Sequence, residues 1–449
     1  MNEPIALPLD QAELEAELHA GSLLRRTVLP SGLRVLTERV PGSSSVAIGL
    51  WVPVGSRDEA SHQYGSTHFL EHLLFKGTET RSAYDIAIAF DRVGGESNAA
   101  TAREHTVYHA KVRDADLSMA VDVLADMITG SVVDPNEFEI ERGVILEELA
   151  MADDDPTDVL WERFYEAVLT GSTLGRPIGG TPESIRAATR DDVWQHYRAN
   201  YRPESLVVTI AGAVDHDDAL RQITDALMRG GWKLDDTSTP VARRSREHPE
   251  LPPMPETVRI DRQLEQVNML IGARGLTSTD PDRQAFALAH RAFGGGMSSR
   301  LFQEVREKRG MAYSVHSFAA GHSDLGISGM YAGCSPERAG EVADLMRAEL
   351  DRLLQHGITE EELADAKGAA AGASALALED VETRMSRLGA AELHRGEFID
   401  LEAALKQIDA VTVDDCTRVM RRVFGGALNT TLIAPGGGTD SQARMGNES

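Results

Sequence analysis

The sequence predicts an α+β protein built from two similar halves. At 449 residues, the chain is roughly two to three times as long as a usual domain, so more than one hydrophobic core is expected. Segments typical of strands and helices follow one another without the strict alternation of a doubly wound sheet. After a polar stretch at residues 230–256, the order of these segments repeats, which indicates a diverged duplication.

The first half is expected to begin with strands and to continue with amphipathic helices. Residues 33–40 and 45–54 carry β-branched side chains on either side of the turn-forming PGSS, which is typical of strands. Ser66 is expected to cap a helix over residues 67–76, which Gly77 ends. Further helices are predicted at 84–93, 115–129, 135–152 and 158–168, and further strands at 106–112 and 206–211.

The stretch at 230–256 is charged and rich in proline, which is typical of a linker. We therefore expect an N-terminal half over residues 1–229 and a C-terminal half over 257–435. Residues 436–449 have no apolar periodicity and are expected to form a disordered tail.

The two halves can be aligned residue by residue over one predicted helix. HFLEHLLFKG, which begins at His68, aligns with FALAHRAFGG in the second half and places His72 over His290. In this alignment His68 corresponds to Phe286, and Glu71 also meets an apolar residue. Chemistry that needs all three polar groups is therefore expected only in the first half.

Composition excludes several classes of protein. The chain has 45 Lys and Arg against 71 Asp and Glu, a net charge of -26 that would repel nucleic acid and anionic lipid. Its apolar runs are too short to span a membrane. Two cysteines cannot form a disulfide framework, and the acidic N-terminus lacks the pattern of a secretory or mitochondrial signal. A cytoplasmic location is therefore expected.

His68, Glu71 and His72 form an H-x-x-E-H motif. On a helix, residues four apart share a face, so both imidazoles can bind one ion with Glu71 beside them. A chance match would be expected on a solvated helix face, but the flanking residues are apolar nearly all round and predict burial. Imidazoles are common zinc ligands, and a catalytic site needs a third protein ligand from elsewhere in the fold. We predict one zinc ion per chain.

Several ordered blocks carry a family resemblance: GSTHFLEHLLFKGT, GGESNAATAREHTVYHAKV, IERGVILEELAM, LGRPIGGTPESI and RLFQEVREKRGMAYSV. Together they resemble the pitrilysin-type (M16) zinc metallopeptidases, in particular the short-chain branch similar to the mitochondrial processing peptidase β subunit. The resemblance covers residues 33–435. It implies hydrolysis of peptide bonds by two halves, each a mainly antiparallel sheet packed with helices, that form a clam-like enclosure around an extended peptide.

The resemblance also implies the remaining metal-site residues. It makes Glu148 the third zinc ligand and Glu141 a hydrogen-bond partner of a ligand histidine, while Glu71 takes a proton from the attacking water. Glu147 is the obvious rival for the ligand position. Residues seven apart lie on one helical face, so Glu141 and Glu148 can both face the metal while Glu147 points about 100° away.

Two further blocks resemble substrate-binding elements of the family. The resemblance implies an edge strand on which the backbone at Asn98 and Ala99 pairs with an extended peptide, with the Asn98 side chain near the scissile bond. The alternative is an ordinary edge strand. In the second half, Arg306 and Tyr313 match a pair that orients the substrate and donates to the oxyanion. The alternatives are a helix-end arginine and a core tyrosine.

The sequence therefore predicts a zinc endopeptidase that acts on extended peptides. The acidic charge favours basic peptides. A processing peptidase that makes selective cuts and an enzyme that degrades short peptides broadly both remain open. The alternative is a non-catalytic partner or scaffold subunit, which the intact motif argues against. Analogy with the family suggests a homodimer.

Overall fold

A computed structural model describes residues 3–436 of the chain, and the predicted tail lies beyond Gly436, outside these residues. The chain divides into two compact units. The first comprises residues up to Ala150, Arg176–Arg244 and Gly372–Lys406, and the second comprises Met151–Gly175, Ser245–Ala371 and the residues from Gln407 onward.

The first unit contains a seven-stranded sheet with the strand order β2-β3-β4-β8-β5-β7-β6. Strands β4 and β8 are parallel and the other neighbours are antiparallel. Its elements are β1 (Ile5–Ala6), β2 (Glu13–Glu17), β3 (Leu23–Val28), β4 (Arg34–Arg39), β5 (Ser45–Val52), α1 (Ser66–Leu74), α2 (Ala83–Asp91), β6 (Glu96–Thr101), β7 (Thr106–Arg113), α3 (Leu117–Gly130), α4 (Pro135–Asp154), α6 (Pro182–Ala187), α7 (Arg190–Asn200), β8 (Val207–Gly212), α8 (His216–Arg229), α12 (Val381–Ala390) and β13 (Glu397–Phe398).

The second unit contains a five-stranded sheet with the order β11-β12-β10-β14-β9. This order reproduces β6-β7-β5-β8-β4 of the first sheet, and the one parallel pair, β14 with β9, occupies the position of β8 with β4. The topology thus shows the duplication. The elements are α5 (Pro156–Val168), β9 (Thr257–Arg262), β10 (Val267–Arg274), α9 (Arg283–Gly294), β11 (Ala312–Gly321), β12 (Gly326–Cys334), α10 (Ala339–His356), α14 (Val413–Phe424) and β14 (Asn429–Pro435). The helices α11 (Glu360–Ala377) and α13 (Leu401–Ala410) cross the boundaries of the units, and the last residues of α4, from Met151 onward, belong to the second unit.

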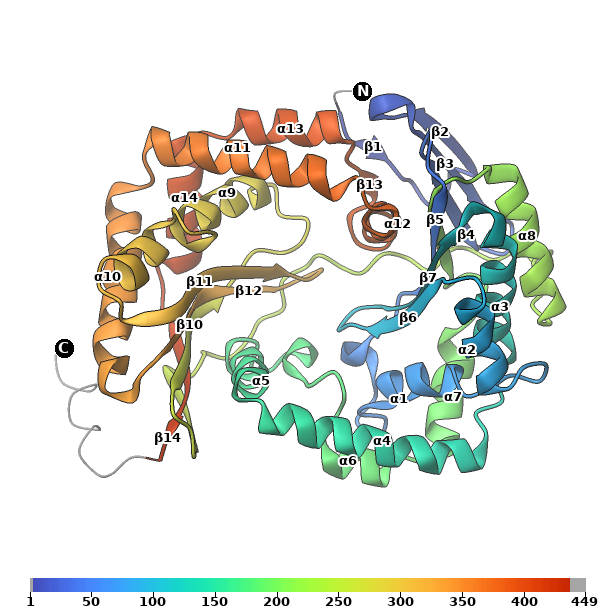
Figure 1. Cartoon of the computed structure of the whole chain (residues 1–449), viewed down its shortest axis with the longest axis horizontal. Coiled ribbons are helices and arrows are strands. Elements are labelled where there is room, and N and C mark those ends of the chain that lie inside the picture. The colour runs from blue at the N-terminus through green and yellow to red at the C-terminus, as the bar shows by residue number, and fades with distance from the viewer. Residues whose placement is uncertain (1–2, 437–449) are drawn as a thin grey trace. The chain divides into compact units, whose positions relative to one another are not determined.

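The central strands of each sheet are buried on both faces. In the first unit, α1, α3 and α8 contribute to an apolar core on one face, and α12 packs on the other against Leu36, Ala47 and Trp51 (Figure 1). In the second unit, α9, α10 and α14 cover one face, and α5 covers the other against Leu270 and Ile433. A sheet with two buried faces requires a helical layer on each side.

The units differ from the predicted halves because each unit includes one helix from the other half of the sequence. Helix α5 precedes the predicted linker but belongs to the second unit, and α12 follows the linker but belongs to the first. Each helix is amphipathic and buries its apolar side chains on the sheet face that would otherwise be exposed to water. The boundaries 1–229 and 257–435 therefore do not separate the two compact units, although residues 231–256 form neither helix nor strand.

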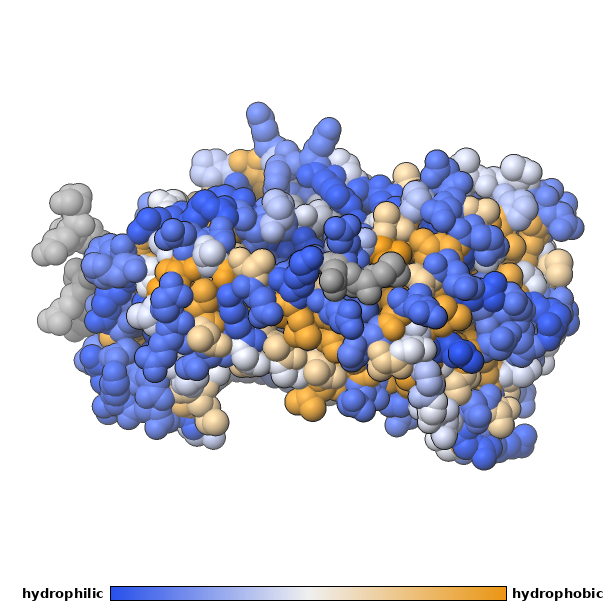
Figure 2. Space-filling view, turned by 90° about the horizontal axis from the view of Figure 1, so that it is seen from above, coloured by the Kyte–Doolittle hydropathy of each residue, from blue (hydrophilic) through white to orange (hydrophobic). Residues whose placement is uncertain are grey.

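Hydrophilic residues cover most of the face seen in Figure 2, and the apolar residues on it form small groups. Within residues 3–436, none of the helices combines the length and the hydropathy that a membrane span requires.

Candidate metal centre

Helix α1 begins at Ser66, and a carboxylate from the preceding loop caps it. Glu59 is 5% exposed and accepts hydrogen bonds from the backbone N–H groups of Gly65, at 2.9 Å, and Thr67, at 2.8 Å. The prediction that Ser66 caps the helix is wrong, since Ser66 is the first helical residue and its hydroxyl has no hydrogen-bond partner within residues 3–436. Gly65 holds the N-cap position with a φ of +88°, which glycine adopts readily, and it has no side chain to act as a cap. The Glu59 oxygens instead accept from two of the backbone N–H groups at the helix N-terminus. Burial raises the pKa of Glu59 to about 7.

The structure brings together one ligand atom from each of His68, His72 and Glu148. The two Nε2 atoms of the histidines are 3.4 Å apart. The Glu148 Oε2 atom lies 3.3 Å from Nε2 of His72 and 3.8 Å from Nε2 of His68. Ligands at zinc bond lengths of about 2.0–2.2 Å in a tetrahedron are about 3.3–3.5 Å from one another. Two of the three separations lie in this range, and the one between Glu148 and His68, at 3.8 Å, is slightly longer, so the atoms are close to the geometry of one face of such a site.

Helix α4 supplies both the third candidate ligand and its supporting carboxylate. Glu141 is buried, and its Oε2 atom lies 2.9 Å from Nδ1 of His72, while its Oε1 atom lies 2.7 Å from Nζ of Lys76. A hydrogen bond at Nδ1 fixes the ring so that Nε2 faces the ligand cluster. Glu147 is exposed and does not belong to the cluster, as the helical spacing predicts.

Burial prepares His68 for a metal. Burial, and to a smaller extent the neighbouring His72, lowers the pKa of His68 to about 4, so the imidazole is neutral at pH 7. Its Nδ1 atom is buried without a hydrogen-bond partner among the described residues. Gly179 packs against this ring: a Cβ atom there would lie 3.6 Å from Nδ1 and 3.2 Å from Cδ2 of Leu149. The contact with the ring would be of ordinary length, and the tight contact would be the one with Leu149.

Glu71 lies on α1 beside the two histidines, and Thr101 holds its carboxylate. The Thr101 hydroxyl, at the end of β6, donates a hydrogen bond to Oε2 of Glu71. Sequence reasoning missed both Thr101 and Glu59. The motif that contains Thr101 indicates roles only for Asn98 and Ala99, and Glu59 lies in a loop without a recognisable motif.

Strand β6 is the outermost strand of its sheet, next to β7. Side chains alternate along a strand, so Ala99 and Thr101 share the face toward α1 and Asn98 lies on the other face. The Asn98 Oδ1 atom accepts a hydrogen bond from the N–H of Ala99. The predicted peptide-binding role of Asn98 and Ala99 stays a prediction.

In the second unit, Arg306 and Tyr313 contact each other. The Arg306 Nη1 atom donates to the Tyr313 carbonyl oxygen at 2.9 Å, and the guanidinium carbon lies 4.5 Å from the centre of the tyrosine ring. The Tyr313 side chain is 79% exposed, so it is not a core tyrosine. Their predicted role in catalysis stays a prediction.

His290, the counterpart of His72, is a buried core residue. Its Nε2 atom lies 2.8 Å from the Ser328 hydroxyl, and its ring meets Phe286 edge-on at 4.5 Å between centroids. Burial lowers its pKa to about 4. Within residues 3–436, His68, His72 and Glu148 are the only group of His, Cys, Asp or Glu side chains arranged to hold a metal ion.

Fold and site together define a class of protein: two sheet-rich α+β units from a duplicated topology, one of which carries an H-x-x-E-H helix with a further carboxylate from a second helix. Residues 34–182 match the family described as Insulinase (Peptidase family M16), and residues 187–369 match the Peptidase M16 inactive domain. The chain belongs to the M16 peptidase family.

Similar proteins extend along almost the whole chain. An uncharacterized zinc protease of Streptomyces coelicolor is 44% identical over 97% of this chain and 94% of its own. The uncharacterized zinc protease YmxG of Bacillus subtilis is 34% identical over 93% of this chain and 100% of its own. A protease from Helicobacter pylori has the same fold, with a TM-score of 0.80 at 22% identity over 91% of this chain and 99% of its own. The predicted family and the α+β fold are confirmed.

Proposed function

We propose that this chain is a zinc-dependent endopeptidase that hydrolyses bonds within extended peptides. The observation that carries the proposal is the cluster of Nε2 of His68, Nε2 of His72 and Oε2 of Glu148 at separations that suit tetrahedral zinc. Relatives that are named zinc proteases support the choice of metal. The neutral imidazole of His68 and the supporting carboxylate of Glu141 suit the same ion.

A bound zinc ion would activate a water molecule and polarise the scissile carbonyl. Glu71 is the proposed general base: it accepts the proton of the attacking water and passes it to the leaving amine. Thr101 restricts the Glu71 carboxylate through its hydroxyl. A base held in one orientation loses less freedom when it reaches the transition state.

The outer edge of β6 is the proposed platform for the substrate backbone, because β6 is an edge strand and touches α1 through Thr101. Tyr313 and Arg306 are proposed to assist the reaction on the strength of the resemblance and of the exposure of Tyr313. A preference for basic peptides, a choice between processing and degradation, and a homodimer stay predictions.

The test is the substitution Glu71→Gln, with Glu147→Gln as the matched control on an exposed position. Glu71→Gln keeps the size of the side chain but removes the proton acceptor, so peptide hydrolysis is expected to fall by about 10²-fold or more while zinc content is retained. Glu147→Gln should hydrolyse peptides like the parent protein. If the parent cleaves no member of a broad peptide library with zinc bound, the alternative of a non-catalytic partner subunit replaces the proposal.

A further inference from the structure

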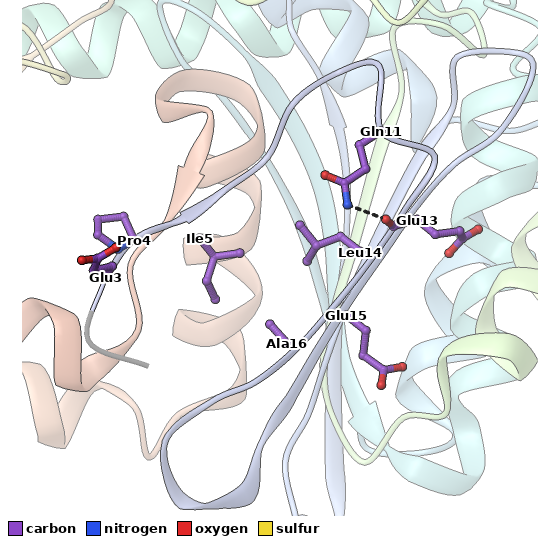
Figure 3. A pocket seen from close by; sticks show the side chains of 8 residues that line it. All are labelled: Glu3, Pro4, Ile5, Gln11, Glu13, Leu14, Glu15 and Ala16. Atoms are coloured by element: carbon purple, nitrogen blue, oxygen red, sulfur yellow. Dashed lines mark hydrogen bonds between the residues drawn. The ribbon is translucent and has the colours of Figure 1, made fainter.

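The strand at the other end of the first sheet also has an open edge. Within the part of the chain that the structure describes, strand β2 pairs with β3 on one side and with no strand on the other. The bonds from the Val28 N–H to the Ala12 carbonyl and from the Leu18 N–H to the Ser22 carbonyl show which residues point toward β3. By alternation, Glu13, Glu15 and Glu17 direct their N–H and C=O groups outward. The Gln11 side chain already donates to the outward carbonyl of Glu13 at 2.8 Å (Figure 3).

A groove of about 650 Å³ runs along this edge. Its lining residues are Glu3, Pro4, Ile5, Gln11 and the stretch 13–16. Figure 3 shows the segment of Glu3–Ile5 on one side and β2 on the other, with the side chains of Ile5 and Leu14 between them. Among residues 3–436, strand β1 pairs only with β13, so it too has an edge without a strand partner. Its volume lies within the range of about 300–1,000 Å³ typical of ligand sites.

The two faces of β2 differ in chemistry. Glu13, Glu15 and Glu17 lie on one face and are exposed. Leu14 and Ala16 lie on the other, where Ala16 joins an apolar cluster and Leu14 packs against it together with Ile5. Arg25 is the one cation that contacts this row among the described residues, at 3.4 Å from Glu15, and it also pairs with Asp217.

We propose that the groove between β1 and β2 binds a basic, extended segment of another polypeptide by strand addition. The backbone of the segment would pair with the outward groups of Glu15 and Glu17. Because side chains directly across two strands share a face, its basic residues would lie opposite the glutamates and its intervening residues would contact Leu14 and Ile5. The expected ligand therefore alternates basic and apolar residues.

Charge argues against a second copy of this chain as the occupant. Pairing of two β2 strands would place one row of glutamates against the other, and like charges across strands are destabilising. The site is also separate from the metal centre. Strands β2 and β6 are the two outer strands of the sheet, and with five strands between them they lie about 29 Å apart at the usual spacing of about 4.8 Å.

The experiment measures binding of a labelled peptide of alternating Val and Arg to the full chain carrying Glu71→Gln, which prevents cleavage. Three peptides are compared by fluorescence anisotropy at low salt: the parent peptide, the same peptide N-methylated on the backbone at alternate residues, and a Val-Glu peptide. N-methylation keeps the charge but removes the strand donors, so it should weaken binding about tenfold or more. The Val-Glu peptide should not bind.

Glu15→Lys and Glu250→Lys, each combined with Glu71→Gln, form a matched pair. Glu250 is exposed in the segment without helix or strand. Glu15→Lys should weaken binding about five- to tenfold and Glu250→Lys should leave it unchanged. Equal binding by the two variants, equal binding of the N-methylated peptide, or a dimer that Glu15→Lys dissociates would overturn the proposal. Each of these outcomes leaves the peptidase proposal untouched, because hydrolysis by the parent chain is measured separately.

Discussion

The carboxylate of Glu141 is expected to set the zinc affinity of the site although it is not among the candidate ligands. We predict that Glu141→Ala weakens zinc binding about 10- to 100-fold, the usual effect of losing a group that orients a metal-bound histidine. In the native structure, Oε2 of Glu141 accepts from Nδ1 of His72 at 2.9 Å, at a position where Glu141 is 1% exposed.

The usual strength of a hydrogen bond to a charged group gives a similar loss of zinc affinity. A hydrogen bond to a charged group contributes about 1.5–3 kcal/mol, and each 1.4 kcal/mol is a tenfold change in affinity, which gives roughly 10- to 150-fold. The substitution also leaves Lys76 without the carboxylate that lies 2.7 Å from its Nζ atom. The free energy of unfolding should therefore fall as well.

The measurement is competition for zinc between the protein and a chelator of known affinity at pH 7. Glu147→Ala is the control, because Glu147 lies on the same helix, is exposed and has no place in the cluster. Equal zinc affinities for Glu141→Ala and Glu147→Ala, with both variants folded, would refute the reasoning that Glu141 orients His72.

Four further predictions concern the metal, the base, the second unit and pH. Elemental analysis should find one zinc per chain, and none tightly bound in His72→Ala, because the cluster loses one of its three ligand atoms. Thr101→Val should lower kcat about tenfold with little change in KM or zinc content, and Thr101→Ser should restore it, because a hydroxyl again holds Glu71. Tyr313→Phe should lower turnover about 10- to 1,000-fold with zinc in place, the range for loss of one oxyanion donor. For His290, burial lowers the folded-state pKa from 6.5 to about 4, so protons bind the unfolded chain first as pH falls from 6.5 to 4. Its contribution to stability is complete above pH 6.5 and is lost at up to about 1.4 kcal/mol per pH unit in that window. Urea unfolding of His290→Gln should show a weaker dependence on pH there.

Each of these expectations has a result that contradicts it. Two tightly bound zinc ions per chain would contradict the single site. A Thr101→Ser variant as slow as Thr101→Val would show that packing of the methyl group, and not the hydroxyl, matters. Unchanged turnover in Tyr313→Phe would remove the tyrosine from the reaction. Parallel pH profiles for His290→Gln and the parent would mean that other groups govern acid unfolding.

Local elements could be predicted from the sequence because their signals lie within a few residues. The β-branched residues on either side of a turn predicted β4 and β5, and helical periodicity predicted α1 and α4 to within a few residues. The same periodicity favoured Glu148 over Glu147 as the third ligand, since a helix turns by about 100° per residue. The structure brings Glu148 to the histidines and leaves Glu147 outside the cluster, so this choice between the two glutamates needed no tertiary information.

Contacts between distant segments could not be predicted in this way. Glu59 replaces Ser66 as the cap of α1 because a loop folds back over the helix N-terminus, and nothing in the spacing of the two residues indicates this. Thr101 meets Glu71 only because β6 ends beside α1. The assignment of α5 and α12 to their units depends on which sheet face each helix covers, and amphipathic periodicity specifies only that some face is covered.

The exchange of α5 and α12 has a consequence for the order in which the chain can mature during synthesis. A ribosome that has released residues 1–244 has delivered every strand of the seven-stranded sheet, but α12, which covers one face of that sheet, is not made until Ala390. Until then Leu36, Trp51 and their neighbours are exposed to water, and α5 likewise waits for the strands of the second unit. Nascent chains should therefore reach a protease-resistant state late, because the first unit lacks α12 until Ala390 and the second lacks β14 until Pro435.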